Sequence, residues 1–87
     1  MRFRVSGRVQ GVAYRASAVD AAVHEGCVGW VRNLPTGDVE GLVQGEASAV
    51  DGFLAWAAKG PAGARVDRLL TDDEEVADDF SRFEIRR

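Results

Sequence analysis

The segment that most constrains the fold of this chain is 7–15, which reads Gly-Arg-Val-Gln-Gly-Val-Ala-Tyr-Arg. An apolar alternation with Phe3 and Val5 precedes it, and an alanine-rich stretch suited to a helix follows it. Gly7 and Gly11 can adopt backbone angles that a side chain would disfavour. The pattern predicts a strand, a glycine-containing turn and a helix start in direct succession.

The same segment has the features of an anion-binding loop. The first N–H groups of a helix lack intrahelical acceptors, and the helix dipole adds a positive potential there. Arg15 falls in the first predicted helical turn and adds a planar, charged fork suited to phosphate oxygens. The segment is not a P-loop, because the Lys-Ser/Thr ending is missing. Taken alone, a glycine turn with an arginine at a helix start is more often structural than catalytic.

Composition indicates one small globular domain over residues 1–87, with 46% hydrophobic and 29% charged residues. Cys27 is the only cysteine, so no internal disulfide can form and a reducing compartment is expected. No long apolar run follows the first residues, so we expect neither a signal peptide nor a membrane span. These observations predict a cytoplasmic location with no membrane partner.

Charge is distributed unevenly along the chain, whose formal net charge is −3. Four arginines precede the first acidic residue, whereas six of the fourteen acids lie in 72–79. The basic N-terminal region can steer a small anion, but the acidic total argues against a nucleic-acid partner. The acidic run lacks the spaced ligands and central glycine of a calcium loop, so we expect a solvated loop there.

Periodicity and turn residues predict two helices and five strands. The first helix ends at Gly26 and has an apolar stripe of Val19, Ala22 and Val23, with Ala18 beside it. The second begins at a capping box, Ser48 to Asp51, and ends at Gly60-Pro61. Its stripe is made of Val50, Phe53, Leu54 and Ala57. The full set of predicted elements is strand 2–8, helix 14–25, strands 28–33 and 39–44, this second helix, a strand around 64–71 and a strand near 81–86.

This order, βαββαβ with an additional short C-terminal strand, predicts an α+β fold. Two helices are expected on one face of a mainly antiparallel sheet. A right-handed crossover makes strands 2–8 and 28–33 parallel. Asn33, at the end of the second strand, is then expected at the same sheet edge as the loop 7–15. Leu34 to Gly37, which contains Pro35, suits a type I turn into the next strand.

Two segments resemble the signatures of the acylphosphatase family. The first is 5–15, Val-Ser-Gly-Arg-Val-Gln-Gly-Val-Ala-Tyr-Arg, and the second is 29–41, Gly-Trp-Val-Arg-Asn-Leu-Pro-Thr-Gly-Asp-Val-Glu-Gly. The resemblance implies a ferredoxin-like α/β sandwich that hydrolyses acyl phosphates to a carboxylate and inorganic phosphate. It also implies that Arg15 binds the phosphoryl group and that Asn33 orients the attacking water. Tyr14 and Thr36 depart from the family pattern, where phenylalanine and aspartate are usual.

The chemistry of such a reaction needs positioning and charge stabilisation more than proton transfer. Charge develops on the three equatorial oxygens of the phosphoryl group, and the carboxylate leaves as a weak base. Backbone amides of Gly11, Val12, Ala13, Tyr14 and Arg15, with the Arg15 side chain, can stabilise that charge. We therefore expect no metal and no cofactor. The proton of the water is expected to pass to a phosphoryl oxygen of the substrate.

The expected partners are a small-molecule acyl phosphate and inorganic phosphate or sulfate as product-like ligands, and the chain is expected to act as a monomer. His24 is expected on the polar face of the first helix, and Cys27 is expected to be a small buried residue. Trp30 and Trp56 are expected to pack rather than to serve as stacking platforms. Two alternatives stay open: a non-catalytic anion-binding module on the same fold, and an RNA-binding sheet with exposed aromatics on its central strands.

Overall fold

The computed structural model of the chain describes residues 1–73 and 79–87. The order of elements agrees with the predicted βαββαβ pattern and its additional C-terminal strand. They are β1 (Arg2–Arg8), α1 (Tyr14–Glu25), β2 (Val28–Asn33), β3 (Val39–Gln44), α2 (Ala47–Ala57), β4 (Arg65–Asp72) and β5 (Phe83–Arg86). The predicted acidic loop falls largely on residues 74–78, outside the described residues. No described helix is long and apolar enough to cross a membrane.

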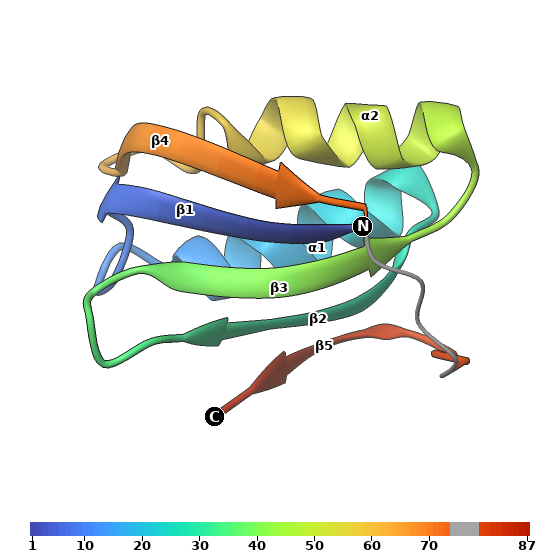
Figure 1. The fold of residues 1–87 in the computed structure, drawn as a ribbon, viewed down its shortest axis with the longest axis horizontal. Helices are drawn as coiled ribbons and strands as arrows, with labels where there is room; N and C mark the ends of the chain where they lie inside the picture. Colours follow the sequence, from blue (N-terminus) through green and yellow to red (C-terminus); the bar gives the residue numbers. More distant parts are fainter. Residues whose placement is uncertain (74–78) are drawn as a thin grey trace.

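The five strands form one sheet in the order β4-β1-β3-β2-β5. β3 pairs antiparallel with β1 and with β2, so β1 and β2 run parallel, as the crossover argument predicts. β5 pairs parallel with β2, and β4 pairs antiparallel with β1. Both helices lie on one face of the sheet (Figure 1). The predicted α+β fold class, a ferredoxin-like sandwich with a mainly antiparallel sheet, is confirmed.

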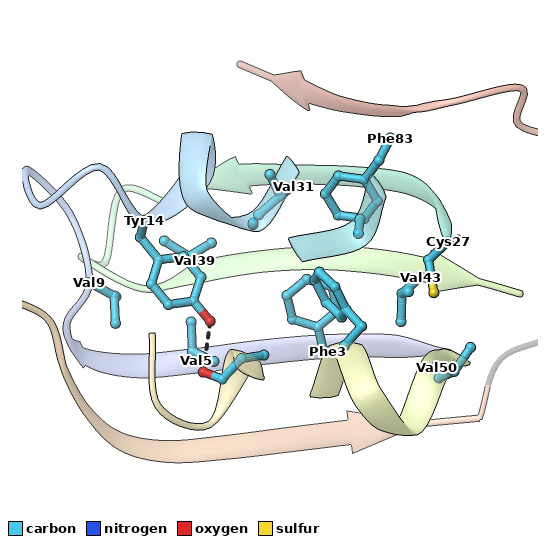
Figure 2. Close-up of a cluster of buried hydrophobic side chains, with 14 residues drawn as sticks. Phe3, Val5, Val9, Tyr14, Cys27, Val31, Val39, Val43, Val50 and Phe83 are labelled. Carbon is cyan, nitrogen blue, oxygen red and sulfur yellow. Dashed lines mark hydrogen bonds between the residues drawn. The ribbon is translucent and has the colours of Figure 1, made fainter. Parts of the chain in front are cut away.

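The hydrophobic core fills the space between the sheet and the two helices. Strand residues alternate between the two faces of the sheet, so Val39 and Val43 of β3 point to the helices while Leu42 points away. Phe53 of α2 lies at the centre, with ring centroids 5.3 Å from both Phe3 and Phe83. Figure 2 shows labelled side chains of the sheet in this cluster together with Tyr14 of α1 and Val50 of α2. The predicted buried state of Cys27 is confirmed.

The buried face of α1 differs from the predicted apolar stripe. Tyr14, Ala18 and Ala22 are the buried residues of this helix, each one turn after the last. Val23 is 68% exposed, so its assignment to the buried stripe was wrong. The side chain of Tyr14 is the largest on this face, and its burial fixes the rotation of the helix. The small side chains of Ala18 and Ala22 then let α1 approach the sheet closely.

The start of α2 also differs from the prediction. The helix begins at Ala47 with Glu46 at the N-cap, and no side chain makes a capping hydrogen bond there. Ser48 lies inside the first turn, so the predicted capping box from Ser48 to Asp51 was wrong. Only Gly45 and Glu46 separate β3 from the helix, and this short connection leaves no room for a later start. The predicted apolar stripe is confirmed, because Val50, Phe53 and Ala57 are buried and Leu54 is half-buried.

The sheet face opposite the helices carries a tryptophan covered by arginines. Trp30 is only 7% exposed although it lies on the open face, where it is opposite Leu42. The guanidinium groups of Arg2, Arg32 and Arg86 lie 5.1–5.6 Å from its ring centroid. Arg32 is held over the ring by Glu40, whose Oε1 accepts from Nε at 2.7 Å. Trp30 therefore packs, as predicted, and its ring is not free to stack on a base.

One buried hydrogen bond joins the start of α1 to the end of α2. Tyr14 Oη donates to the backbone oxygen of Ala57 at 2.8 Å (Figure 2). Ala57 is in the last turn of α2, where carbonyl groups have no intrahelical donor. The tyrosine thus supplies a hydrogen-bond donor. Phenylalanine, which is usual at this position in the family pattern, would lack that donor. Burial raises the pKa of the Tyr14 hydroxyl well above its ordinary value of 10.0.

We expect Tyr14→Phe to lower the free energy of unfolding by about 1–2 kcal/mol, because a buried carbonyl loses its donor. The raised folded-state pKa stabilises the native state fully below pH 10.0, and this contribution is lost as the pH rises above that value. The difference between wild type and Tyr14→Phe should therefore shrink above pH 10. Urea denaturation of both proteins at pH 7 and at pH 10.5 measures this, and equal stability at pH 7 would contradict it.

Candidate active site

The path from β1 to α1 needs unusual backbone angles at three positions. The pairing of β1 with β4 shifts register between Ser6 and Gly7, where φ is +124°. A Cβ at Gly7 would collide with the backbone oxygen of Arg65, so glycine is required there for both reasons. Gly11 has φ +75° and open space around it, so only its backbone conformation demands glycine. Ala13, at the N-cap of α1, has φ +60° although it is not a glycine.

This path presents the start of α1 at one edge of the sheet. The first intrahelical bond runs from Ser17 N to Ala13 O at 3.0 Å. The N–H groups of Tyr14, Arg15 and Ala16 therefore have no acceptor within the helix. Figure 1 shows that the end of β1, the start of α1 and the ends of β2 and β5 meet at this edge. A cluster of outward N–H groups of this kind is suited to an anion.

A hollow of about 190 Å³ opens at this edge. Of the predicted site residues, it brings together Gly11, Ala13, Tyr14 and Arg15 from the loop and helix start with Asn33 from the end of β2. The side chain of Val12 is instead half-buried against the hydrophobic core. The complete lining consists of Val9, Gln10, Gly11, Ala13, Tyr14, Arg15, Ala16, Asn33 and Ile85.

Arg15 differs from the other partly buried arginines because it has no carboxylate partner in the described part of the chain. Arg4 Nε lies 2.7 Å from Asp38 Oδ2, and Arg2 and Arg32 both pair with Glu40. Half-buried Arg15 has no such partner among residues 1–73 and 79–87. A guanidinium group in a hollow without a protein anion is available to an anion from outside.

Asn33 has an unsatisfied polar atom. Its Oδ1 is buried and has no hydrogen-bond partner among the described residues. Leaving a buried acceptor without a donor costs about 1–3 kcal/mol, and such exceptions gather at functional sites. Asn33 lines the hollow, and the terminal torsion of asparagine is soft, so its amide can turn toward a ligand held there. Asn33 can then bind a water molecule held there.

Gln10 fixes the position of Asn33 relative to the loop. Its Nε2 donates to the backbone oxygens of Leu34 at 2.8 Å and of Asp38 at 2.9 Å. Both hydrogens of one side-chain amide therefore bind the turn that follows β2. Within the turn, Gly37 N donates to Leu34 O at 3.1 Å, which is the closing bond expected of the predicted four-residue turn. Because Leu34 follows Asn33 directly, the clamp sets the distance between the two halves of the hollow.

Thr36 occupies a turn position where aspartate is usual in the family pattern, and its hydroxyl still provides a hydrogen-bond acceptor there. Its Oγ1 accepts from Asp38 N at 3.4 Å and from Arg4 Nη2 at 3.3 Å. Arg4 in turn binds Asp38, so the hydroxyl is part of a small network that joins β1 to the turn. The threonine therefore retains the acceptor role of an aspartate side chain.

The other ionisable side chains are poorly suited to act on a substrate in this hollow. Tyr14 holds its proton, because burial raises its pKa and its hydroxyl donates to Ala57. Cys27 is buried in the core, and burial, with a smaller contribution from the charge of Glu25, raises its pKa. His24 is exposed, as predicted, and lines a larger depression of about 550 Å³ with Asp20 and Glu25. The two carboxylates there would repel an anionic substrate.

Sequence analysis did not assign four of the lining residues to the site, namely Val9, Gln10, Ala16 and Ile85. Gln10 lies between the two glycines of the loop, and that position was the one signal that could have drawn attention to it. Ile85 alternates with charged residues in the last strand, and nothing in that pattern places it at the site. It reaches the hollow because β5 pairs with β2, which brings Ile85 opposite Val31. The parallel pairing carries this side chain to the edge where Asn33 lies.

Comparisons with known proteins agree with this architecture. The acylphosphatase family model matches residues 1–85. An acylphosphatase of Anaeromyxobacter dehalogenans is 51% identical, over 98% of this chain and 91% of the relative. The solved acylphosphatases of Coxiella burnetii and Bacillus subtilis superpose with TM-scores of 0.90 and 0.94, at 38% and 30% identity. The first superposition covers 98% of this chain and 88% of the Coxiella protein, and the second covers 99% of this chain and 96% of the Bacillus protein.

The fold, and the fact that these matches cover nearly the whole chain, place the protein among small α+β hydrolases that act on acid anhydrides. The chain belongs to the acylphosphatase family. The expected enzyme class, a hydrolase of acyl phosphates, is thereby confirmed at the level of the family.

We expect Gln10→Ala to lower kcat about tenfold while the inhibition constant of inorganic phosphate changes less than twofold. Loss of the clamp lets Asn33 move relative to Arg15, and small misplacements of this kind slow catalysis more than binding. Steady-state kinetics with acetyl phosphate and phosphate as inhibitor measure both values. Gln44→Ala is the matched control, because Gln44 is half-buried at the end of β3 and does not line the hollow. An unchanged kcat in Gln10→Ala would contradict the positioning role.

Proposed function

We propose that the hollow at the start of α1 hydrolyses the carboxyl-phosphate bond of a small acyl phosphate. Arg15 and the N–H groups of 11–15 bind the phosphoryl group, and Asn33 orients the attacking water. The observation that carries this proposal is the pairing, in one hollow, of an arginine and an amide oxygen that have, respectively, no anion and no donor among the described residues. The chain is proposed to act as a monomeric, cytoplasmic, single-domain enzyme over 1–87, without nucleic acid or membrane partner.

The first task of the site is to neutralise the phosphoryl group. Its transition state is loose, with charge spread over three equatorial oxygens. The helix-start N–H groups and the guanidinium of Arg15 are donors fixed before the substrate arrives, so little reorganisation is needed during the reaction. The guanidinium offers a two-donor fork to two oxygens at once. The same donors accept inorganic phosphate or sulfate as product-like ligands.

The second task is to direct water at phosphorus. The oxygen of the water bonds to phosphorus as the bond between phosphorus and the carboxylate oxygen breaks. Among the described residues, the lining contains no aspartate, glutamate or histidine, and Tyr14 retains its proton. The proton of the water therefore passes to a phosphoryl oxygen of the substrate, and the products are a carboxylate and dihydrogen phosphate. Asn33 acts only by holding the water in line with the leaving group.

The leaving group explains why the site can lack a general acid. A carboxylate is the base of an acid with a pKa near ~4–5, so it departs at neutral pH without a proton. The charge balance is met by Arg15 and the amides, and the mechanism requires neither a metal nor a cofactor. Turnover of acetyl phosphate in excess EDTA tests the enzyme against the alternative of a non-catalytic anion-binding module. A protein that binds phosphate but releases none from acetyl phosphate would support the module.

Arg15→Lys should lower kcat/KM for acetyl phosphate by about 10²-fold or more, since lysine keeps the charge but loses the fork. The measurement is steady-state phosphate release in EDTA, with circular dichroism to confirm the fold. Arg8→Lys is the matched control, because Arg8 lies in the same segment but is exposed and outside the hollow. Arg15→Lys turnover within a few-fold of wild type would remove Arg15 from the proposed role.

Asn33→Ala should lower kcat by about 10²–10³-fold and leave phosphate binding nearly intact, because the side chain acts on water. Phosphate at ten times its Kd should stabilise wild type and Asn33→Ala alike, by about 1.4 kcal/mol, or roughly 5–10 °C in Tm. Arg15→Ala should lose most of that shift. If Asn33→Ala loses phosphate stabilisation as completely as kcat, Asn33 is an anion ligand and the assignment fails.

A further inference from the structure

Ile85 is the feature of the hollow that phosphate binding does not explain. It is 46% exposed, one of the large hydrophobic side chains that the described residues leave on the surface. Exposed hydrocarbon gives an anion no donor and no charge. It lines the hollow together with Arg15 and Asn33, although it belongs to the last strand. Its position therefore suits a part of the substrate other than the phosphoryl group.

The strand pairing explains why this side chain faces the site. Ile85 is opposite Val31 in the parallel pair, and Asn33 follows Val31 by two residues on the same face of the sheet. The neighbours Glu84 and Arg86 point to the open face, where Arg86 covers Trp30. The alternation of β5 thus places its charged residues away from the hollow and its branched apolar residue at the rim.

The phosphoryl group and the acyl group of a substrate meet different sides of the hollow. The proposed phosphoryl ligands, Arg15 and the first N–H groups of α1, come from the loop and helix start, whereas Ile85 comes from β5. An acyl group attached to that phosphoryl group extends beyond these donors toward the mouth. Val9 and Tyr14 are buried beneath the hollow, and Ala13 and Ala16 offer only methyl groups. Among the described lining residues, Ile85 is the one large apolar side chain exposed at that mouth.

We propose that Ile85 contacts the acyl group of the substrate and makes the site prefer acyl phosphates with a large apolar acyl group over acetyl phosphate. This inference rests on the proposed function and names the substrate class of the same site. Removal of apolar surface from water on binding supplies the preference. The contact is present in the ground state and in the transition state, so it acts mainly through KM.

The test compares benzoyl phosphate with acetyl phosphate in wild type, Ile85→Ala and Ile85→Thr. The ratio of the two kcat/KM values should fall about tenfold in Ile85→Ala, near the lower end of what one lost apolar contact costs in an enclosed pocket. Ile85→Thr keeps the β-branched shape that suits a strand and should show a fall of about threefold. The change should be in KM for benzoyl phosphate, and the inhibition constant of inorganic phosphate should stay within twofold.

Leu70→Ala is the matched control, because Leu70 is 53% exposed on β4 and does not line the hollow. Its ratio should equal that of wild type. If both Ile85 variants hydrolyse the two substrates in the wild-type ratio, the acyl contact is overturned while the proposed function stands. Phosphate inhibition that weakens as much as benzoyl phosphate turnover would also overturn it, since Ile85 would then support the hollow itself. If wild type hydrolyses neither substrate, both proposals fall.

Discussion

The exit of the chain from β1 is the constraint on which the rest of the site depends. Gly7, Gly11 and Ala13 all have positive φ, and this path aims the first N–H groups of α1 at the sheet edge. Glycine adopts such angles at little cost, but an alanine in the left-handed region costs about 1–3 kcal/mol. The burial of Tyr14, which follows directly, offsets that cost by anchoring the helix. The strained residue therefore lies between a glycine-containing turn and the buried tyrosine of the helix.

Two side chains then convert this edge into a fixed site. Gln10 joins the loop to the turn after β2, and Tyr14 joins the start of α1 to the end of α2. Each spans elements far apart in the sequence and uses backbone carbonyls as acceptors, so neither depends on charge. Catalysis by positioning requires such rigidity, because the proposed chemistry gains little from proton transfer. The positions of Arg15 and Asn33 follow from these two ties.

Much of this arrangement could be predicted from the sequence, and the exceptions have local causes. Strands are predicted well where the signals are local. Alternation and turn residues predicted a strand around 64–71, and β4 lies at Arg65–Asp72. The capping box predicted at Ser48 was wrong because the short connection after β3 makes the helix begin earlier, at the expense of the capping preference of Ser48. The predicted burial of Val23 was wrong because helical periodicity identifies an apolar stripe but does not show which of two adjacent stripes faces the core. Ile85 was missed because its place at the hollow depends on the pairing of β5 with β2.

The distribution of charge explains how an acidic protein can present an anion site. On the open face, Glu40 is shared by two arginines and Asp38 binds Arg4, so much of the positive charge there is compensated. The two arginines that share Glu40 also cover Trp30, so this ring is not the exposed aromatic that an RNA-binding sheet would need. Arg15 lacks such compensation among the described residues, and the adjacent helix start adds to its potential. Carboxylates on the open face therefore compensate the arginines there, whereas the charge of Arg15 has no carboxylate partner among the described residues and lies at the hollow, beside the apolar rim formed by Ile85.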